Sequence, residues 1–442
     1  MNKYIKLIEV IDGDLCSGCG ACAGICPVHA LDINSKVSHK PVLNEEKCIQ
    51  CNLCYEVCPG KGWNPVEKAN EMCIRENINM DLKYGPVVDY YLGKATDSSV
   101  HLSGASGGIG TALLLYLLDK KIVEEVVVIT LEKGIPKVLF TNDPYEIKAA
   151  SGSKYSPVPV MKEVLRELSN RPRKIAITVT PCQMAALENA IKLRRNISRD
   201  LIYAIGLFCG DVKDYKSVYY ISKNLNIKNI NECEFIGWRY GKWPGKASFR
   251  LKDGSIVGKE LQKWLGLSRT FYTLNRCLMC PSRENWLADI SLADNHKGYT
   301  DETVIIVRTK KGYDLLNQAC TDGVINKRVM GKSSNEFCVT LTKFKSALIY
   351  IEYTRKKKLP APTYDYEPVI YLGDLKPRTK KIFLFKHKMF MFFRNKKVYN
   401  ILSKSAPVME KVGVFTNGFP STIPGISYFS KIKKFIKNNK NR

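Results

Sequence analysis

Eight cysteines near the start of the chain recur with a regular spacing. Residues 16–27 read C-S-G-C-G-A-C-A-G-I-C-P, and residues 48–59 read C-I-Q-C-N-L-C-Y-E-V-C-P. Each run is C-x-x-C-x-x-C-x-x-x-C followed by proline, which is the spacing of bacterial proteins that hold two iron–sulfur clusters. A four-iron cluster needs four thiolates that converge on one site. The doubled run therefore predicts two [4Fe–4S] clusters and the transfer of electrons one at a time.

In such doubled runs the fourth cysteine of each run ligates the other cluster. We therefore assign one crossed set of four cysteines to each cluster: Cys16, Cys19, Cys22 and Cys58 to the first, and Cys26, Cys48, Cys51 and Cys54 to the second. Zinc sites also use C-x-x-C pairs, but they rarely present eight cysteines in this order. Residues 1–15 lack the apolar stretch of a secretory signal, so we expect a reducing cytoplasm, where disulfides are rare.

Four further cysteines follow predicted strands or form a pair. Cys182 lies in T-P-C-Q, Cys209 ends G-L-F-C, and Cys277 and Cys280 form a C-x-x-C ahead of A-D-I at 288–290. Strand ends of an α/β sheet converge on one edge, so these cysteines can meet in a third cluster. Two buried thiols beside a minor zinc site are the alternative.

Two loops rich in small residues have the composition of phosphate-binding loops. Residues 103–110, S-G-A-S-G-G-I-G, open onto a predicted helix whose N-terminus would favour a dinucleotide pyrophosphate. Residues 151–155, S-G-S-K-Y, add a lysine. The first loop lacks the G-x-G-x-x-G fingerprint and its acidic partner, so a tight turn before a helix explains it as well.

The elements that must position these residues alternate between strands and helices from about residue 88 onward. Apolar runs predict strands at 125–131, 174–179, 201–208 and 304–308, and helical periodicity predicts helices at 108–118, 160–168, 183–193 and 313–319. Asp253–Gly254 lies between two short β-like runs and predicts a hairpin. Residues 60–86 show little periodicity and are interpreted as a polar connector.

In this order, the motifs resemble the coenzyme F420 hydrogenase/dehydrogenase β-subunit family over about residues 12–60 and 90–325. The resemblance implies FAD beside a [4Fe–4S] cluster, with hydride exchange between the flavin and coenzyme F420 or a similar carrier. It supports the third cluster at Cys182, Cys209, Cys277 and Cys280. It also implies that the flavin is surrounded by residues of both small-residue loops: Ser103, Gly104, Ser106, Gly107, Gly108, Gly152, Ser153 and Lys154. This chain departs from the family in one motif, because Ala293–Asp294 replaces the usual Gly–Asp pair.

The expected fold is thus an α+β ferredoxin-like domain followed by an α/β flavin- and cluster-binding domain, with a basic C-terminal extension. The boundaries are 1–62 for the ferredoxin-type domain, 63–87 for the connector, 88–329 for the β-subunit-like domain and 330–442 for the extension. The predicted function is that of an iron–sulfur flavoprotein oxidoreductase acting with a redox partner protein or hydrogenase/dehydrogenase subunit. The alternative is an electron-transfer subunit, such as one serving a reductase in glycan synthesis, with no free carrier of its own. No catalytic residue is assigned, and His101 and His296 are the histidines nearest family motifs.

The charge of the chain is concentrated in its extension. The formal net charge is +27, and residues 330–442 hold 24 Lys and Arg against 6 Asp and Glu, or +18. Lysines interleave with bulky apolar residues at 378–405 and 428–436, a composition typical of helices at a membrane interface. Three explanations of the basic extension stay open: peripheral contact with a membrane, docking of an acidic partner protein, or charged side chains that are solvated and have no binding role. The tail has no recognised nucleic-acid motif, so no nucleic-acid partner is expected.

Overall fold

The computed structural model describes residues 6–364, except 35–37, 82–83, 133–134, 195, 261–263, 265–267, 269–270, 296–300 and 331–338. It also describes 381, 384–385, 387–388 and 391–392, and it gives only the backbone for 339–345. The predicted interfacial stretch at 428–436, and most of the one at 378–405, lie outside the described residues. No helix of the described part of the chain is long and apolar enough to cross a membrane.

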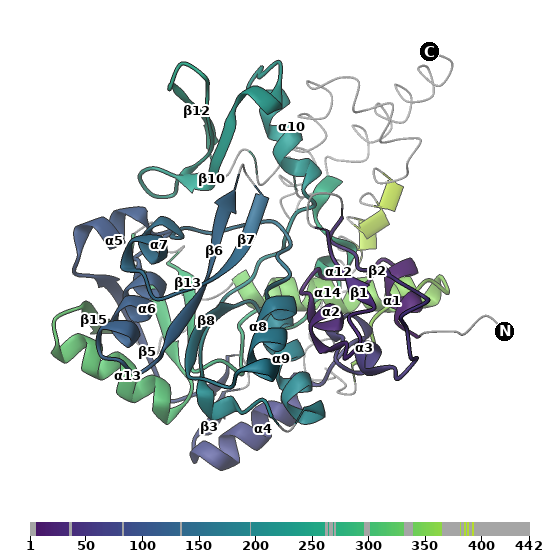
Figure 1. Ribbon diagram of the computed structural model, residues 1–442, viewed down its shortest axis with the longest axis horizontal. Helices are drawn as coiled ribbons and strands as arrows, with labels where there is room; N and C mark the ends of the chain where they lie inside the picture. The colour runs from purple at the N-terminus through teal and green to yellow at the C-terminus, as the bar shows by residue number, and fades with distance from the viewer. Residues whose placement is uncertain are drawn as a thin grey trace.

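A mixed sheet forms the centre of the molecule (Figure 1), and its strand order is β15-β5-β14-β13-β9-β8-β6-β7. Its strands are β5 (Asp89–Ala95), β6 (Glu125–Glu132), β7 (Ile135–Thr141), β8 (Ile175–Val179), β9 (Ile202–Leu207), β13 (Ile290–Asp294), β14 (Thr303–Val307) and β15 (Ile325–Val329). Strands β6, β8, β9 and β13 pair in parallel, while β14 is antiparallel to both β13 and β5. Strands β5, β6, β8, β9 and β13 therefore all end at one edge of the sheet, here called the carboxyl edge.

Helices cover both faces of this sheet. On one face, α8 (Val160–Asn170) and α9 (Pro181–Leu193) pack over Ile175 and Ile177 of β8. On the other face, α6 (Ile109–Asp119) and α13 (Lys310–Thr321) share a core with Ala176 of the same strand. Burial on both sides explains why β8, apart from Thr178, reads as a run of apolar residues rather than as an alternating one.

The N-terminal cysteine-rich segment, residues 6–62, docks on α8. It contains α1 (Leu7–Asp12), α2 (Ala21–Ile25), α3 (Leu53–Glu56), the short helix η1 (Pro59–Lys61), and the paired strands β1 (Leu31–Asp32) and β2 (Val42–Leu43). The Met161 amide donates to the Cys19 carbonyl at 2.9 Å. A Cβ atom at Gly24 would lie 2.4 Å from the Met161 carbonyl oxygen, so only glycine permits this approach.

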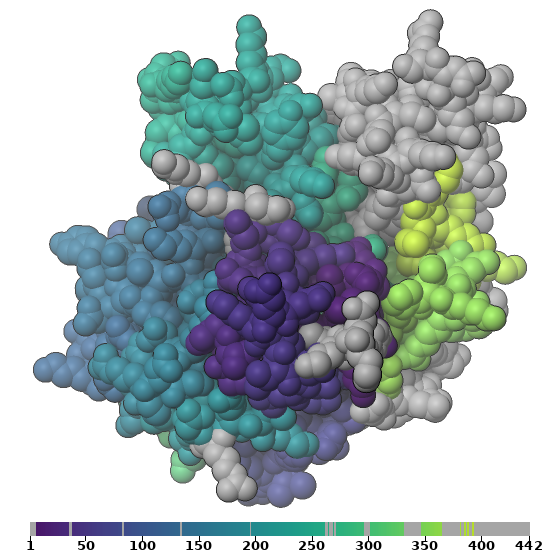
Figure 2. Space-filling view, turned by 45° about the vertical axis from the view of Figure 1, so that its right-hand side comes forward, coloured from purple at the N-terminus to yellow at the C-terminus, as the bar shows by residue number. Residues whose placement is uncertain are grey.

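The beginning of the predicted extension packs against this N-terminal segment. In α14 (Val339–Lys356), the buried side chains of Leu348 and Ile351 share a core with Leu7 and Val10. Figure 2 shows the green surface of this helix beside the purple N-terminal segment. The Thr363 amide donates to the Lys61 carbonyl at 2.7 Å. Residues of α14, together with Ala361 and Tyr364, thus share a hydrophobic core with cysteines of both runs.

A small sheet follows β9 and α10 (Lys216–Asn224). It comprises β10 (Glu234–Tyr240), β11 (Lys246–Arg250) and β12 (Ile256–Glu260) around buried Trp238, Phe249 and Trp264. Strands β11 and β12 pair antiparallel, and Gly254 in their turn has φ +82°, which confirms the predicted hairpin. Short helices also occur between these elements: α5 (Ser98–Ser103), α7 (Pro144–Ala149), α12 (Asn275–Leu278), η2 (Arg199–Leu201) and η3 (Ile230–Glu232).

All four predicted strands and all four predicted helices of the α/β region are confirmed, with ends that differ by a few residues. The description of residues 60–86 as a polar connector with little periodicity was incomplete, because this stretch holds α4 (Pro65–Glu76) and the strands β3 (Asn79–Asp81) and β4 (Gly85–Val87). The Asn64 side chain accepts from the Val66 and Glu67 amides at 3.1 Å, and proline occupies the first helical position. Asparagine followed by proline is a helix-start signal that the sequence does contain.

Candidate functional site

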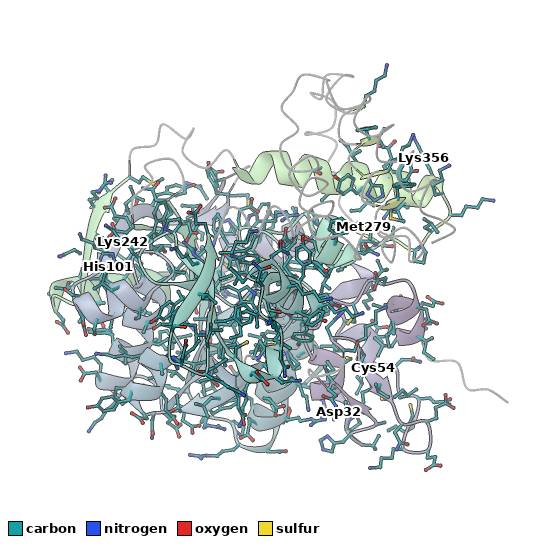
Figure 3. All side chains as sticks on the ribbon, turned by 90° about the horizontal axis from the view of Figure 1, so that it is seen from above. Asp32, Cys54, His101, Lys242, Met279 and Lys356 are labelled. Atoms are coloured by element: carbon teal, nitrogen blue, oxygen red, sulfur yellow. The ribbon has the colours of Figure 1, made fainter. Side chains whose placement is uncertain are left out.

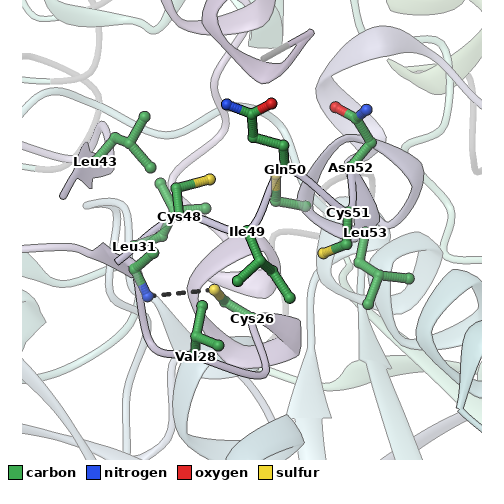
Figure 4. Close-up of a pocket in the computed structure, with 12 residues that line it drawn as sticks. Cys26, Val28, Leu31, Leu43, Cys48, Ile49, Gln50, Cys51, Asn52 and Leu53 are labelled. Carbon is green, nitrogen blue, oxygen red and sulfur yellow. Dashed lines mark hydrogen bonds between the residues drawn. The ribbon is translucent and has the colours of Figure 1, made fainter. Parts of the chain in front are cut away.

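The eight cysteines of the N-terminal runs line two separate hollows. Cys16, Cys19, Cys22 and Cys58 line a hollow of about 340 Å³, counting its open mouth, together with Leu7 and Val10. Cys26, Cys48, Cys51 and Cys54 line a second hollow of about 350 Å³, where Val28, Leu43 and Ile49 supply the apolar wall (Figure 4). These two groups are the crossed sets that the spacing predicts, and we call them the first and second cysteine sets.

Local backbone geometry turns the sulfur atoms toward these hollows. Gly18 and Gly20 have φ of +72° and +87°, and Asn52 before α3 has φ +59°. Such left-handed residues are tolerated by glycine and by asparagine, which fits the small and polar residues between the cysteines. Amide groups point at the sulfurs, since Gly18 donates to Cys16 Sγ at 3.4 Å and Gly60 donates to Cys58 Sγ at 3.3 Å.

The four later cysteines come together near the carboxyl edge, although up to 98 residues separate them (280 − 182). Cys182 lies in the first turn of α9, Cys209 follows β9, and Cys277 lies in α12, three residues before Cys280. Burial raises the pKa of Cys209 well above its usual range, and negative charge on Cys277, Cys182 and Cys280 raises it further. We call these residues the third cysteine set.

Arg283 ties the third set together. Its Nη2 donates to the Cys277 carbonyl at 3.1 Å, its Nη1 donates to the Gly210 carbonyl, and its own carbonyl accepts from the Cys209 amide at 3.0 Å. Thr180 Oγ1 lies 3.4 Å from Cys182 Sγ. One arginine thereby fixes the loop after β9 against the C-x-x-C loop.

The three sets are close enough to act on one another electrostatically. After burial, Cys182 of the third set contributes most to the raised pKa of Cys19 in the first set. Cys54 of the second set is likewise among the charges that raise the pKa of Cys22 in the first. The first set is therefore near both the third and the second.

Burial keeps most of these thiols protonated in the absence of a metal. It raises the pKa of Cys16 and of Cys277 to about 12 and that of Cys54 to about 11. Iron would reverse this preference, because a bound cation stabilises thiolate. In the described part of the chain, no three His, Cys, Asp or Glu side chains form a group that could hold a single metal ion.

The small-residue loops meet at the carboxyl edge. Thr111 Oγ1, in the first turn of α6, lies 3.2 Å from Ser151 Oγ. Gly152 has φ +86°, and a Cβ atom there would have Ser103 O as its nearest neighbour, at 3.8 Å. The two loops are therefore adjacent, with space beside Gly152.

Gly107 has a structural reason to be glycine. A Cβ atom there would lie 2.4 Å from the Gly93 carbonyl oxygen of β5 and 2.9 Å from the Thr303 amide nitrogen. The Gly107 amide donates to Thr303 Oγ1 at 2.8 Å, and Ser106 Oγ lies 2.8 Å from the same oxygen. Gly104 likewise packs against Gly108, with a Cβ-to-Cα distance of 2.8 Å. These glycines close the loop onto the sheet.

Lys154 and Tyr155 of the second loop are both partly buried. Lys154 Nζ donates to the carbonyls of Ser151 and Gly152 at 2.9 and 3.0 Å, and burial lowers the pKa of this lysine to about 7. Tyr155 packs edge-on against Trp264, with ring centroids 5.4 Å apart. Asp294, in the motif that departs from the family pattern, pairs with Arg239 of β10 at 2.6 Å. It thus joins the carboxyl edge to the small sheet.

Of the two histidines near the motifs, His101 (labelled in Figure 3) pairs through Nε2 with Asp301 at 3.0 Å. His296 lies outside the described residues. Sequence reasoning missed Arg276, Arg283 and Arg239, because the local sequence around an arginine gives no signal of what its guanidinium will contact.

The doubled cysteine runs and the cysteines gathered at a sheet edge mark an iron–sulfur protein. Residues 15–61 match the model of a 4Fe-4S dicluster domain. Residues 90–165 and 172–332 match the N-terminal and C-terminal models of the coenzyme F420 hydrogenase/dehydrogenase β-subunit. The chain belongs to this family, whose members are subunits of oxidoreductases.

Individual relatives agree with this assignment. A subunit of the F420H2 dehydrogenase of Methanosarcina mazei is 26% identical over 296 residues, covering 65% of this chain and 77% of that protein. The coenzyme F420-dependent sulfite reductase of Methanocaldococcus jannaschii is 24% identical over 331 residues, covering 71% of this chain and 47% of the reductase.

The fold also has a match among solved structures. A chain in the F420-reducing [NiFe] hydrogenase complex of Methanosarcina barkeri aligns with a TM-score of 0.53 and 20% identity. The alignment covers 66% of this chain and all of that one.

Proposed function

We propose that this chain passes electrons between reduced coenzyme F420, or a similar two-electron carrier, and three [4Fe–4S] clusters, by way of FAD bound at the carboxyl edge. The observation that carries the proposal is the succession of cysteine sets. The third set lies at the carboxyl edge, the first set adjoins it through Cys182 and Cys19, and the second set opens to solvent at Cys51, which is exposed.

The donor chemistry of each set fits a four-iron cluster, because each offers four sulfur atoms, and those of the first and second sets line largely apolar hollows. The first set would hold one cluster through Cys16, Cys19, Cys22 and Cys58, and the second through Cys26, Cys48, Cys51 and Cys54. The third would use Cys182, Cys209, Cys277 and Cys280. The cysteines of the first and third sets are buried or partly buried, while the second set, with exposed Cys51, faces the side from which a partner protein could approach.

The flavin would occupy the space beside Gly152, where the two small-residue loops meet. The start of α6 would face its pyrophosphate, and Lys154 supplies a cation beside that position. A bound flavin accepts electrons in pairs and releases them singly, which is the exchange that a hydride carrier and an iron–sulfur chain require. The residues of the chain bind, orient and shield these groups.

The relatives named above favour coenzyme F420 as the carrier over an electron-transfer subunit with no carrier of its own, because they are proteins of F420-dependent enzymes. We expect a further subunit as the electron partner, since relatives are subunits of dehydrogenases and hydrogenases. Peripheral association with a membrane through the basic extension, residues 330–442, stays a proposal of the sequence alone.

Anaerobic purification tests the cofactor content. The full chain is expected to carry about twelve irons, four for each cluster, and one FAD released on denaturation. Cys182→Ala is expected to lose about four irons, whereas Cys73→Ala, whose thiol lies on α4 outside all three sets, is expected to keep all of them. Eight irons in the wild type, with Cys182→Ala unchanged, would remove the third cluster. Wild-type protein that releases no flavin would remove FAD.

A further inference from the structure

Arg276 is a buried cation that bridges two of the cysteine sets. Its side chain is only 4% exposed. Its Nη2 donates to the carbonyl of Pro59 at 2.9 Å, and Pro59 directly follows Cys58 of the first set. Its Nη1 donates to the Met279 carbonyl at 3.3 Å, within the C-x-x-C of the third set. One guanidinium group therefore joins the backbones that carry the two sets.

In the described part of the chain, no Asp or Glu oxygen lies within ion-pair distance, 4.0 Å, of the Arg276 guanidinium nitrogens. Its guanidinium carbon lies 5.6 Å from the centroid of the Tyr364 ring, and its Nε has no hydrogen-bond partner. A buried cation normally has an anionic partner, because an unpaired charge in a low dielectric is costly.

The cysteines provide the missing negative charge. The Arg276 guanidinium contacts the carbonyl next to Cys58 of the first set and a carbonyl between Cys277 and Cys280 of the third. Thiolates that hold iron in these two sets would give Arg276 a counter-charge on either side.

We propose that Arg276 is the shared counter-charge of the first and third clusters and that it raises the reduction potential of both. This inference rests on the proposed function, because it requires that the two sets hold clusters. Each electron that enters a cluster adds one negative charge, and a nearby cation in a low-dielectric interior stabilises that reduced form. An electron moving between the two clusters would stay beside the same positive charge, which disfavours trapping at either one.

Potentiometric titration of the anaerobic full chain, followed by electron paramagnetic resonance, tests this. Arg276→Gln removes the charge and keeps a hydrogen-bonding side chain, while Arg276→Lys keeps the charge. Arg194→Gln is the matched control, because Arg194 Nη2 also donates to a carbonyl of the N-terminal segment, Ile25 O at 2.7 Å, and its Nε is likewise unpartnered. Arg194 is not among the strongest charges on any cysteine of the first or third set.

In Arg276→Gln, the reduced-to-oxidised ratio of the first and third clusters at a fixed potential is expected to fall about tenfold, which is about 59 mV for one electron. Arg276→Lys and Arg194→Gln are expected to titrate like wild type. An unchanged midpoint in iron-replete Arg276→Gln would overturn the proposal, as would an equal shift in Arg276→Lys.

Loss of iron is also informative. If Arg276→Gln loses iron and Arg276→Lys keeps it, the charge itself is required, as proposed. If both variants lose iron equally, Arg276 supplies shape rather than charge, and the proposal fails. Wild-type protein with about eight irons would instead contradict the third cluster of the proposed function. The midpoint of the first cluster would then remain as the test of Arg276.

Discussion

Replacing Cys58 with alanine is expected to remove the cluster beside Cys16, Cys19 and Cys22, not the cluster beside its sequence neighbour Cys54. Cys58 lines only the first hollow, and Cys26 lines only the second. Each single variant should therefore lose about four of about twelve irons. Iron counts of the single variants cannot separate crossed from uncrossed ligation, since both arrangements lose one cluster.

Double variants separate the two arrangements. With crossed ligation, Cys22→Ala with Cys58→Ala removes two ligands of one cluster and should still lose only about four irons. Cys22→Ala with Cys26→Ala removes one ligand from each cluster and should lose about eight. The assay is iron and acid-labile sulfide per protein after anaerobic purification. The reverse order of losses would refute the crossed assignment, and thermal unfolding of each variant checks that the rest of the protein is intact.

Three further predictions concern the surroundings of the site. Gly107→Val is expected to lose flavin only together with stability, measured by denaturant unfolding, because the new side chain would meet the Gly93 carbonyl oxygen; flavin loss from a protein as stable as wild type would contradict this. In flavin-free protein, the free energy of unfolding of wild type, compared with that of Lys154→Met, should rise between pH about 7 and the usual pKa range of lysine. The reason is that in this pH range the unfolded chain keeps the proton that folded Lys154 has released. Parallel pH profiles of the two proteins would contradict the lowered pKa. Leu348→Ala is expected to cost about 2–5 kcal/mol by leaving a cavity between α14 and the N-terminal segment, and an unchanged denaturation midpoint would show that α14 does not dock there.

The docking of α14 changes how the tail must be studied. Stopping the chain near Met330 would strip Leu348 and Ile351 from the core that they share with Leu7 and Val10. A chain ending at Tyr364 keeps these contacts and removes most of the basic stretches. Vesicle sedimentation with that shorter chain therefore separates membrane binding by the tail from damage to the cysteine-rich segment.

The sequence predicted the parts of the fold that depend on local pattern. Helical and strand periodicity located α6, α8, α9 and α13 and the strands β6, β8, β9 and β14, because each buries a face whose spacing is visible in the sequence. The cysteine spacing likewise predicted which four residues would line each N-terminal hollow. The strand-end argument brought Cys182 and Cys209 to one edge, since parallel strands end together.

Features that depend on distant partners could not be predicted. Arg276 contacts Pro59, 217 residues away in sequence, and nothing in either local pattern indicates that pairing. Gly107 looked like a ligand-facing glycine, but its close neighbour is the backbone of β5. The pairing of Asp294 with Arg239, 55 residues away in sequence, is another contact that no local pattern indicates.

Anaerobic mixing of the full chain with reduced coenzyme F420 tests the central claim most directly, with flavin and cluster reduction followed by absorbance and electron paramagnetic resonance. Wild type is expected to reduce its flavin and then its clusters. Cys209→Ala should still reduce the flavin but leave the first and second clusters largely oxidised, because the proposed route runs from the flavin through the third cluster to the N-terminal runs. Failure of reduced F420 to reduce a wild-type protein that carries flavin and about twelve irons would contradict the account, as would wild-type rates of cluster reduction in Cys209→Ala.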